Sequence, residues 1–225
     1  DEVIQPSQDR VTPFCPHYHQ CGGCQLQHVE PVAQVSQKQQ AVLDQLLHWG
    51  KVTPDNVLTP VTSADKGYRS RARLGVWIES DGRLSLGFRA KNSKKITSIS
   101  ECRVLDERLN GLLVPLQSTL QRLSWKHIVT HIECIATQTT LGLIVRHTKA
   151  VSVKDREQLR DFSQQSGAII WFAGNQPGLT DMAGEEVDPR LFYQLDGLDI
   201  GFHPQDFTQI NRAINQQMWD RVATL

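Results

Sequence analysis

Three cysteines stand within ten positions of one another near the start of the chain, in the stretch FCPHYHQCGGCQLQH. They are Cys15, Cys21 and Cys24, whereas the other two cysteines, Cys102 and Cys134, stand alone much later. Thiolates at C-x5-C-x2-C spacing are typical metal ligands, because a C-x2-C pair directs two sulfurs into one shared site. We therefore interpret this stretch as a metal-binding loop.

A fourth ligand is needed to complete either a tetrahedral zinc site or a cubane iron–sulfur cluster. Cys102, in SISECRVL, is the better candidate, because we predict it at a strand-to-helix junction where a side chain can swing out. Cys134 alternates with apolar residues in HIECIAT, which predicts a core position. Gly22 and Gly23 carry no Cβ, so backbone N–H groups can approach metal-bound sulfur closely.

The spacing of the cysteines alone does not distinguish a zinc site from an iron–sulfur cluster. Zinc sites usually pair two short cysteine knuckles, whereas three clustered ligands and one distant ligand are more typical of an iron–sulfur cluster. Thiols that bind nothing are a third interpretation. His17, His19 and His28 offer alternative ligands, but their polar neighbours predict imidazoles exposed to solvent.

Length and composition are those of a globular protein. A chain of 225 residues with 39% hydrophobic residues suffices for one large domain or two small ones. No apolar run approaches the roughly 18 residues of a membrane span. The first residues, DEVIQPSQDR, lack the basic start and apolar centre of a signal peptide. We therefore expect a cytoplasmic protein with reduced cysteines, no membrane association and a monomeric state.

Helical periodicity marks four segments that would position these residues. A helix over 30–50 begins with Pro31 and carries apolar residues at helical spacing. A second helix runs from about Val104 to Leu123 and is interrupted or kinked at Pro115. A third, over 153–166, is capped by Ser152 and ends at Gly167. The chain closes on an amphipathic helix whose apolar face holds Ile214, Met218, Val222 and Leu225.

Strand patterns separate these helices. KGYRSRARLGVWI and LSLGFR flank the turn SDGR and predict one hairpin, while HIVTHIECIAT and TLGLIVRHT predict a second. AIIWFAG, LFYQL and LDIGF are also typical of strands. Hairpins mixed with helices predict an α+β fold, with a central mixed α/β domain.

Positive charge concentrates in one part of an otherwise neutral chain. Residues 66–108 contain 11 basic and 5 acidic side chains, although the whole chain has 24 of each. Arg69, Arg71 and Arg73 alternate, so a strand would present all three on one face to RNA or DNA phosphates. Arg89 and Lys91, in RAKNSKK, would extend this surface. The alternative is a solvated strand face with salt bridges elsewhere.

Three motifs together resemble a known family. CPHYHQCGGCQLQH, the lone cysteine of ECRVL and GFHPQDFTQIN resemble the RNA uracil-C5 methyltransferases that carry an iron–sulfur cluster, and among them the branch that modifies 23S ribosomal RNA. The related tRNA enzymes lack the cysteine motif. The resemblance covers nearly the whole chain. It implies that Gln209 contacts S-adenosylmethionine and that one [4Fe-4S] cluster is ligated by Cys15, Cys21, Cys24 and Cys102.

The resemblance also implies a division into domains. Residues 1–12 would be the tail of an N-terminal TRAM-type β-barrel, and 13–205 the central RNA-binding domain with the cluster loop, from which helix 30–50 packs on the catalytic domain. Residues 206–225 would begin a truncated, doubly wound (Rossmann-like) methyltransferase domain. The family's Pro-Cys nucleophile and late Glu base are absent from the sequence. We therefore assign no catalytic residue and expect this chain alone to be inactive.

Family chemistry explains the need for an RNA-holding domain. The nucleophilic cysteine adds to C6 of uracil, the resulting enolate takes the methyl group at C5, and a base then removes the C5 proton. The uracil must first leave its stack, so grip on the surrounding RNA is required. Two alternatives from other classes are a zinc-stabilised RNA-binding module without catalysis and an iron–sulfur redox or sensor protein.

Overall fold

A mixed eight-stranded sheet forms the centre of the computed structural model, which describes residues 3–224. The strand order is β3-β2-β1-β4-β5-β6-β7-β8. The strands are β1 (Arg71–Ile78), β2 (Leu84–Arg89), β3 (Ile96–Ser98), β4 (Val129–Ala136), β5 (Leu141–His147), β6 (Ala168–Ala173), β7 (Leu179–Thr180) and β8 (Glu186–Val187). All neighbouring pairs are antiparallel except β5 and β6. This mixed α/β arrangement confirms the predicted fold class.

Both predicted hairpins are present. β1 pairs with β2 across a turn in which Gly82 has a φ of 83°, and β4 pairs with β5. The first strand begins at Arg71, later than the sequence pattern suggested. β3, β7 and β8 were not predicted, since two or three residues carry too little alternation to be recognised.

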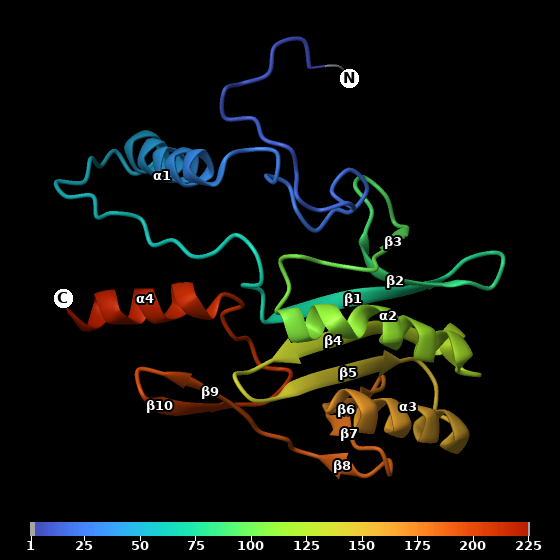
Figure 1. Ribbon diagram of the computed structural model, residues 1–225. Coiled ribbons are helices and arrows are strands. Elements are labelled where there is room, and N and C mark those ends of the chain that lie inside the picture. Colours follow the sequence, from blue (N-terminus) through green and yellow to red (C-terminus); the bar gives the residue numbers. More distant parts are fainter. Residues whose placement is uncertain (1–2, 225) are drawn as a thin grey trace.

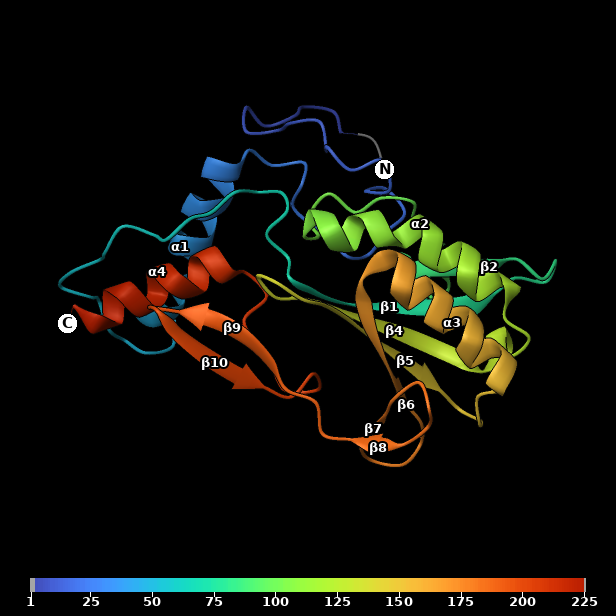
Figure 2. The same ribbon diagram turned by 60° about the horizontal axis from the view of Figure 1, so that its bottom comes forward.

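Two helices cover one face of the sheet, as Figure 2 shows. They are α2 (Glu107–Arg122) and α3 (Val153–Ser166), and α3 makes the crossover that the parallel pair β5–β6 requires. Ser152 caps α3 by accepting from the N–H of Asp155, and Gly167 ends it at a φ of 68°, both as predicted. A main core fills the space between the helices and the sheet. From α2 it takes Leu109, Leu112, Leu113, Leu116 and Leu120, and Thr119 of the same helix is also buried.

Of the two alternatives predicted at Pro115, an interruption or a kink, the interruption does not occur. α2 begins at Glu107, after the N-cap Asp106, and continues through Pro115. Proline costs the helix one hydrogen bond and crowds the carbonyl four residues earlier, here that of Gly111. Burial of Leu113 and Leu116 on either side of the proline stabilises the helix against this cost.

The opposite face of the sheet is covered only in part. A separate hairpin of β9 (Leu191–Leu195) and β10 (Leu198–Phe202) places Leu191 and Phe202 in a second, smaller core against Ile135, Ile144 and Trp171. Trp77 and Arg73, farther along the same face, are exposed. This open part of the sheet is therefore available to a partner.

Two further helices stand away from the sheet, as Figure 1 shows. They are α1 (Pro31–His48), with Pro31 in its first turn as predicted, and α4 (Arg212–Ala223); neither has a buried residue. The linker before β1 lies along α4, where Arg221 and Gln217 donate to the carbonyls of Thr59 and Thr62. A short 3-10 turn, η1 (Lys126–Ile128), precedes β4. Among the described helices, none has the length and apolar character needed to cross a membrane.

Candidate metal centre and nucleic-acid interface

The cysteine loop is a chain of tight turns. Tyr18 N–H donates to the carbonyl of Cys15 at 3.1 Å, and Cys21 N–H to that of His17 at 2.7 Å. Gly23 N–H lies 3.4 Å from the Cys21 sulfur, the approach of backbone to sulfur that the Gly-Gly pair predicted. These turns direct the thiols of the loop towards one side.

Cys102 faces the loop from the junction between β3 and α2, as predicted. Its backbone N–H donates to Oδ1 of Asn110 at 2.6 Å, and its carbonyl accepts from Leu105 at 2.9 Å. Arg69 fixes the following residues, because its N–H donates to the Val104 carbonyl at 2.8 Å. The remote cysteine is therefore held by α2 and by the chain that leads into β1.

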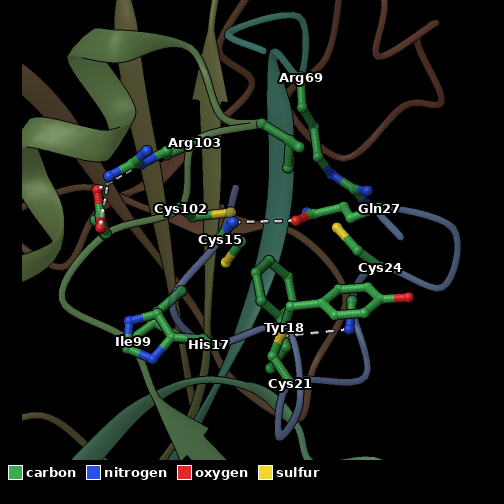
Figure 3. A pocket seen from close by; sticks show the side chains of 14 residues that line it. Cys15, His17, Tyr18, Cys21, Cys24, Gln27, Arg69, Ile99, Cys102 and Arg103 are labelled. Carbon is green, nitrogen blue, oxygen red and sulfur yellow. Dashed lines mark hydrogen bonds and ion pairs between the residues drawn. The ribbon is translucent and has the colours of Figure 1, made fainter. Parts of the chain in front are cut away.

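The four cysteines line one pocket (Figure 3). Its other walls come mainly from Tyr18, Gln27, Phe88 and Ile99, with Arg69 and Arg103 at the edge. Within residues 3–224, no three His, Cys, Asp or Glu side chains are gathered tightly enough to hold a single metal ion. Four thiols nevertheless line the same pocket. They are Cys15, Cys21, Cys24 and Cys102.

Burial favours the protonated form of three of the pocket thiols in the absence of a metal. It raises the pKa of Cys15 and of Cys21, and raises that of Cys102 to about 11. Cys134 lies outside the pocket in the main core, as predicted, and burial raises its pKa to about 12. Cation binding would displace the protons of the pocket thiols, because thiolate is the form that ligates.

The predicted exposure of the histidines was wrong for two of the three. His28 is half-buried, and its Nδ1 lies 2.6 Å from the hydroxyl of Tyr18, which also donates to the Gln25 carbonyl. His17 is half-buried too, with an Nε2 that is enclosed and has no hydrogen-bond partner among the described residues. His19 is exposed as expected. Polar sequence neighbours predicted exposure wrongly here, because the loop folds so that its own residues partly cover the two imidazoles.

The arginines at 69, 71 and 73 do not form one shared solvent face, contrary to prediction. Arg69 precedes β1, lines the cysteine pocket and donates from Nε to the Arg71 carbonyl at 2.9 Å. Arg71 is half-buried and donates to the carbonyls of Pro204 and Asp206. Only Arg73 is exposed. Arg71 is turned away from solvent because its guanidinium donates to the backbone carbonyls of Pro204 and Asp206. Arg69 is turned away because it lines the cysteine pocket.

Strand register gives Arg73 basic neighbours on the open face of the sheet. Arg73 pairs with Glu133 of β4, and Arg146 of β5 pairs with His131. Glu133 accepts from Arg146 Nε at 2.5 Å and lies 4.0 Å from Arg73 Nε. Burial and then the charges of Arg73, Arg146 and Arg89 lower the pKa of His131. We call Arg73, Arg89, His131 and Arg146 the basic sheet face; one carboxylate, Glu133, is set among them.

A second basic segment follows β2. Residues 89–95, here called the basic loop, contain Arg89, Lys91, Lys94 and Lys95 and no acidic side chain. All four are exposed, and none forms an ion pair within the described part of the chain. The loop closes through Ala90 N–H, which donates to the Lys95 carbonyl at 2.9 Å.

The segment with Gln209 lies beside the residues that lead into β1, where Arg69 forms a bridge with Asn211. Ser70 holds it, donating from both N–H and Oγ to the Ile210 carbonyl at 2.8 and 2.9 Å. Asn211 caps α4 by accepting from Ile214 N–H at 3.1 Å. Gln209 itself is exposed and borders a small pocket beside Thr208 and Arg212. The sequence motif thus has an ordered backbone with an accessible side chain.

Sequence reasoning missed two members of the basic sheet face, Arg146 and His131. Alternation in VTHIECIA did place His131 and Glu133 on the side opposite the apolar residues. Nothing in the sequence, however, sets β4 beside β1 or Arg146 beside His131, because these pairs depend on register between separate strands.

Comparison with known proteins gives relatives along the whole chain. The 23S rRNA (uracil(1939)-C(5))-methyltransferase RlmD of Acinetobacter baumannii strain AB0057 is 37% identical over 219 residues, 96% of this chain and 47% of the relative. RlmD of Francisella tularensis subsp. novicida strain U112 is 36% identical over 231 aligned positions, 100% of this chain and 51% of the relative. The chain therefore spans about half the length of these relatives. No protein-family model matches it.

A solved structure shares the fold. The crystal structure of the Pyrococcus abyssi tRNA (uracil-54, C5)-methyltransferase in complex with S-adenosyl-L-homocysteine matches with a TM-score of 0.68 at 20% identity, and the match covers 100% of this chain and 53% of that one. At this identity the likeness concerns the fold. The sequence relatives confirm the resemblance on which the three motifs agreed. Over the half of those enzymes that it spans, this chain is similar in sequence to the RlmD 23S rRNA (uracil-C5)-methyltransferases.

Proposed function

We propose that this chain is part of an S-adenosylmethionine-dependent methyltransferase that methylates C5 of a uracil in 23S ribosomal RNA. The observation that carries the proposal is identity of 36–37% with RlmD enzymes along essentially the whole chain. The cysteines of one pocket and the ordered Gln209 segment add structural support. We propose further that the enzyme works as a monomer in the cytoplasm.

Methyl transfer provides the test of this function. Protein extended to the full length of the RlmD relatives should move a labelled methyl group from S-adenosylmethionine to 23S ribosomal RNA. Uracil tritiated at C5 should release tritium in equal amount, because methylation replaces that hydrogen. Transfer to another base, or to another atom of uracil, would overturn the assignment. The 225-residue chain alone should show no turnover, since the family's nucleophile and base are not among its residues.

We propose that the pocket cysteines ligate one [4Fe-4S] cluster. The donor set is all thiol, the thiols surround a common space, and Gly23 places an N–H against the Cys21 sulfur. The cluster would act as a structural cross-link between its cysteine ligands. No redox role is needed, because methyl transfer from a sulfonium involves no electron transfer. The chain's own contribution is to tie the N-terminal loop to the start of α2. The proposed ligands are Cys15, Cys21, Cys24 and Cys102.

Metal analysis tests the cluster separately from activity. Anaerobically prepared protein should contain about four irons and four acid-labile sulfides per chain. Serine at any one of the four pocket positions should deplete both. The matched control is Cys134→Ser, a buried thiol in the main core that should leave iron and sulfide unchanged. Stoichiometric zinc without sulfide would show a zinc site instead.

We propose that RNA is bound through the basic sheet face and the basic loop. Arg73, Arg89 and Lys91 are exposed and suit phosphate contact. For Arg69 and Arg71, their neighbours in the fold favour a role in positioning the cysteine pocket and the Gln209 segment over phosphate contact. Arg146 replaces them on the open sheet.

We propose the remaining domain assignments on the same basis. Residues 1–12 belong to the tail of a TRAM-type barrel, 13–205 to the RNA-binding domain and 206–225 to the start of the methyltransferase domain. Gln209, exposed beside a small pocket, is the proposed contact to S-adenosylmethionine. α1 has no buried residue, and its apolar side chains include Val42 and Leu47, which are more than half exposed. This unpacked helix supports its proposed docking on the catalytic domain.

A further inference from the structure

The basic loop is joined to the cysteine loop by backbone hydrogen bonds. Gly22 N–H donates to the Arg89 carbonyl at 2.8 Å, and Lys91 N–H donates to the Gln20 carbonyl at 2.8 Å. Between them, Cys21 and Ala90 form an antiparallel bridge. One loop, 15–24, thus carries three of the pocket thiols on one side and a short backbone ladder to the basic loop on the other.

A side-chain contact strengthens this junction. The Lys91 ammonium lies 4.0 Å from the centre of the Tyr18 ring, and Tyr18 is 6% exposed within the cysteine loop. A cation over an aromatic face is attracted by the ring quadrupole. Lys91 is therefore held at a fixed place although its side chain is exposed, whereas an isolated surface lysine samples many rotamers.

The basic loop connects β2 to β3, and it is held by that hairpin, in which Ala90 N–H donates to the Lys95 carbonyl, and by the ladder to the cysteine loop. Four like charges in seven residues repel one another, and no acidic residue lies between Asp81 and Glu101 to offset them. Asn92, at its tip, has a φ of 54°, a left-handed conformation that a non-glycine residue adopts at some cost. The ladder to residues 20–22 therefore adds to the hairpin in fixing where these charges point.

The cysteine loop is itself poorly supported by burial. Of its three thiols, only that of Cys21 belongs to a buried residue, and the loop is fixed by turns and by a few side-chain hydrogen bonds. A group bound by all four pocket thiols would cross-link this loop to Cys102 and the N-terminus of α2. Cross-linking of this kind reduces the freedom of the segment it closes.

We propose that the metal centre positions the basic loop as a phosphate-binding surface for RNA, through the ladder between residues 20–22 and 89–91. This rests on the proposed function, and it gives the cysteine site a task in substrate binding. Loss of the metal frees the cysteine loop, the ladder opens, and Arg89, Lys91, Lys94 and Lys95 no longer converge on the RNA backbone.

The first experiment establishes whether the basic loop touches phosphate. Binding of the 225-residue, metal-loaded chain to a 23S ribosomal RNA fragment is measured across a range of salt concentrations. Changing the four basic residues of the loop to Gln should flatten the log–log salt slope by about 2.8, because each lost single-strand phosphate contact removes about 0.7. Lys154→Gln with Arg160→Gln, exposed on α3 on the other side of the sheet, is the matched control and should leave the slope unchanged. An unchanged slope in the loop variant would overturn the proposal.

The second experiment tests the coupling to the metal centre. Removing the metal from the wild-type chain with a chelator should flatten the salt slope of RNA binding by most of the amount that the loop variant does. Reconstitution with iron and sulfide should restore the original slope. Gly22→Ala should reproduce the flattening while iron stays bound, because a Cβ at Gly22 would lie 2.8 Å from the Arg89 carbonyl oxygen and push the two loops apart. Gly111→Ala, on the exposed side of α2, is the matched control, since a Cβ there would meet no atom within 4 Å.

The outcomes separate this inference from the function on which it rests. If metal-free wild-type chain binds RNA with the same slope as loaded chain, the coupling is wrong, even where the charge variant shows that the loop contacts RNA. If Gly22→Ala loses iron, the comparison of metal-free with loaded wild type still decides. Methylation of 23S ribosomal RNA by the full-length protein would stand in either case.

Discussion

Two helices of similar length, α1 and α2, differ completely in how they are held. α1 has 18 residues and none is buried, whereas α2 has 16 and buries six against the sheet and α3. Both sequences carry an apolar stripe at helical spacing. Because an isolated helix of this length is marginal in water, α1 depends on a partner in a way that α2 does not. The amphipathic pattern of a helix therefore predicts which face is apolar. Only the tertiary structure shows whether that face is buried against other elements.

The same contrast extends to the regions around these helices. The sheet with α2 and α3 is stabilised by a continuous apolar core. The N-terminal loop is held mainly by hydrogen bonds and by its place in the cysteine pocket, and the linker over 49–66 is held by hydrogen bonds to α4. Functional groups gather in the second region and at its border. The stable part of the molecule thus acts as a scaffold for the proposed metal site and the proposed RNA contacts.

Equivalent leucine truncations in the two helices should give the largest difference. Leu116→Ala in α2, where the side chain is 1% exposed, should lower the free energy of unfolding by about 2–5 kcal/mol through lost burial and a residual cavity. Leu47→Ala in α1, where the side chain is 54% exposed, should change it by less than about 0.5 kcal/mol. Urea denaturation monitored by circular dichroism measures both. Equal effects would show that α1 is packed in solution and would break the comparison.

Removing a buried carboxylate should have a smaller effect, dependent on pH. Asp155 accepts from Ser124 N–H at 2.8 Å and from Ser152 Oγ at 2.6 Å, joining the start of α3 to the end of α2. Burial acts to raise its pKa, but the bonds from Ser124 and Ser152 outweigh burial and hold the pKa below its ordinary value of 3.8. The ionised form is thus favoured by folding, and this stabilisation is present at neutral pH and lost as pH falls below about 3.8.

Asp155→Asn should therefore lower the free energy of unfolding at pH 7 by about 1.5–3 kcal/mol, the range for hydrogen bonds to charged groups. The difference from wild type should shrink as the solution is acidified. Asp44→Asn, on the exposed α1, is the control and should change stability little at either pH. Denaturation midpoints from pH 7 to pH 3 decide. A difference that grows on acidification would contradict a depressed pKa for Asp155 in the folded protein.

The smallest expected effect is a gain within the scaffold. Gly111 lies on the exposed side of α2, and a Cβ there would meet no atom within 4 Å. Gly111→Ala should raise the free energy of unfolding by about 0.5–1 kcal/mol, because alanine has the higher helix propensity. Gly167→Ala also has open space, but its φ of 68° disfavours an L side chain, so stability should fall by about 1 kcal/mol. A thermal scan of the two variants separates propensity from backbone strain.

Local signals in the sequence predicted the helices and the two hairpins of the sheet, and they indicated the metal-binding chemistry that we propose. Pro31, the Ser152 cap and Gly167 marked helix ends because their effects act within a turn of the chain. The spacing of Cys15, Cys21 and Cys24 indicated a metal ligand set, since a thiolate motif is local too.

Tertiary structure alone decided which charged residues share a surface. The sequence placed Arg69, Arg71 and Arg73 together, yet carbonyls at 204 and 206, more than 130 residues later, take Arg71, and strand register brings Arg146 beside His131 instead. The ladder from Gly22 to Arg89 was equally invisible, because backbone hydrogen bonds between distant loops leave no residue-type signature. The sequence states the chemistry of each side chain directly. Which side chains become neighbours in space depends on strand register and burial, which are decided by the whole fold.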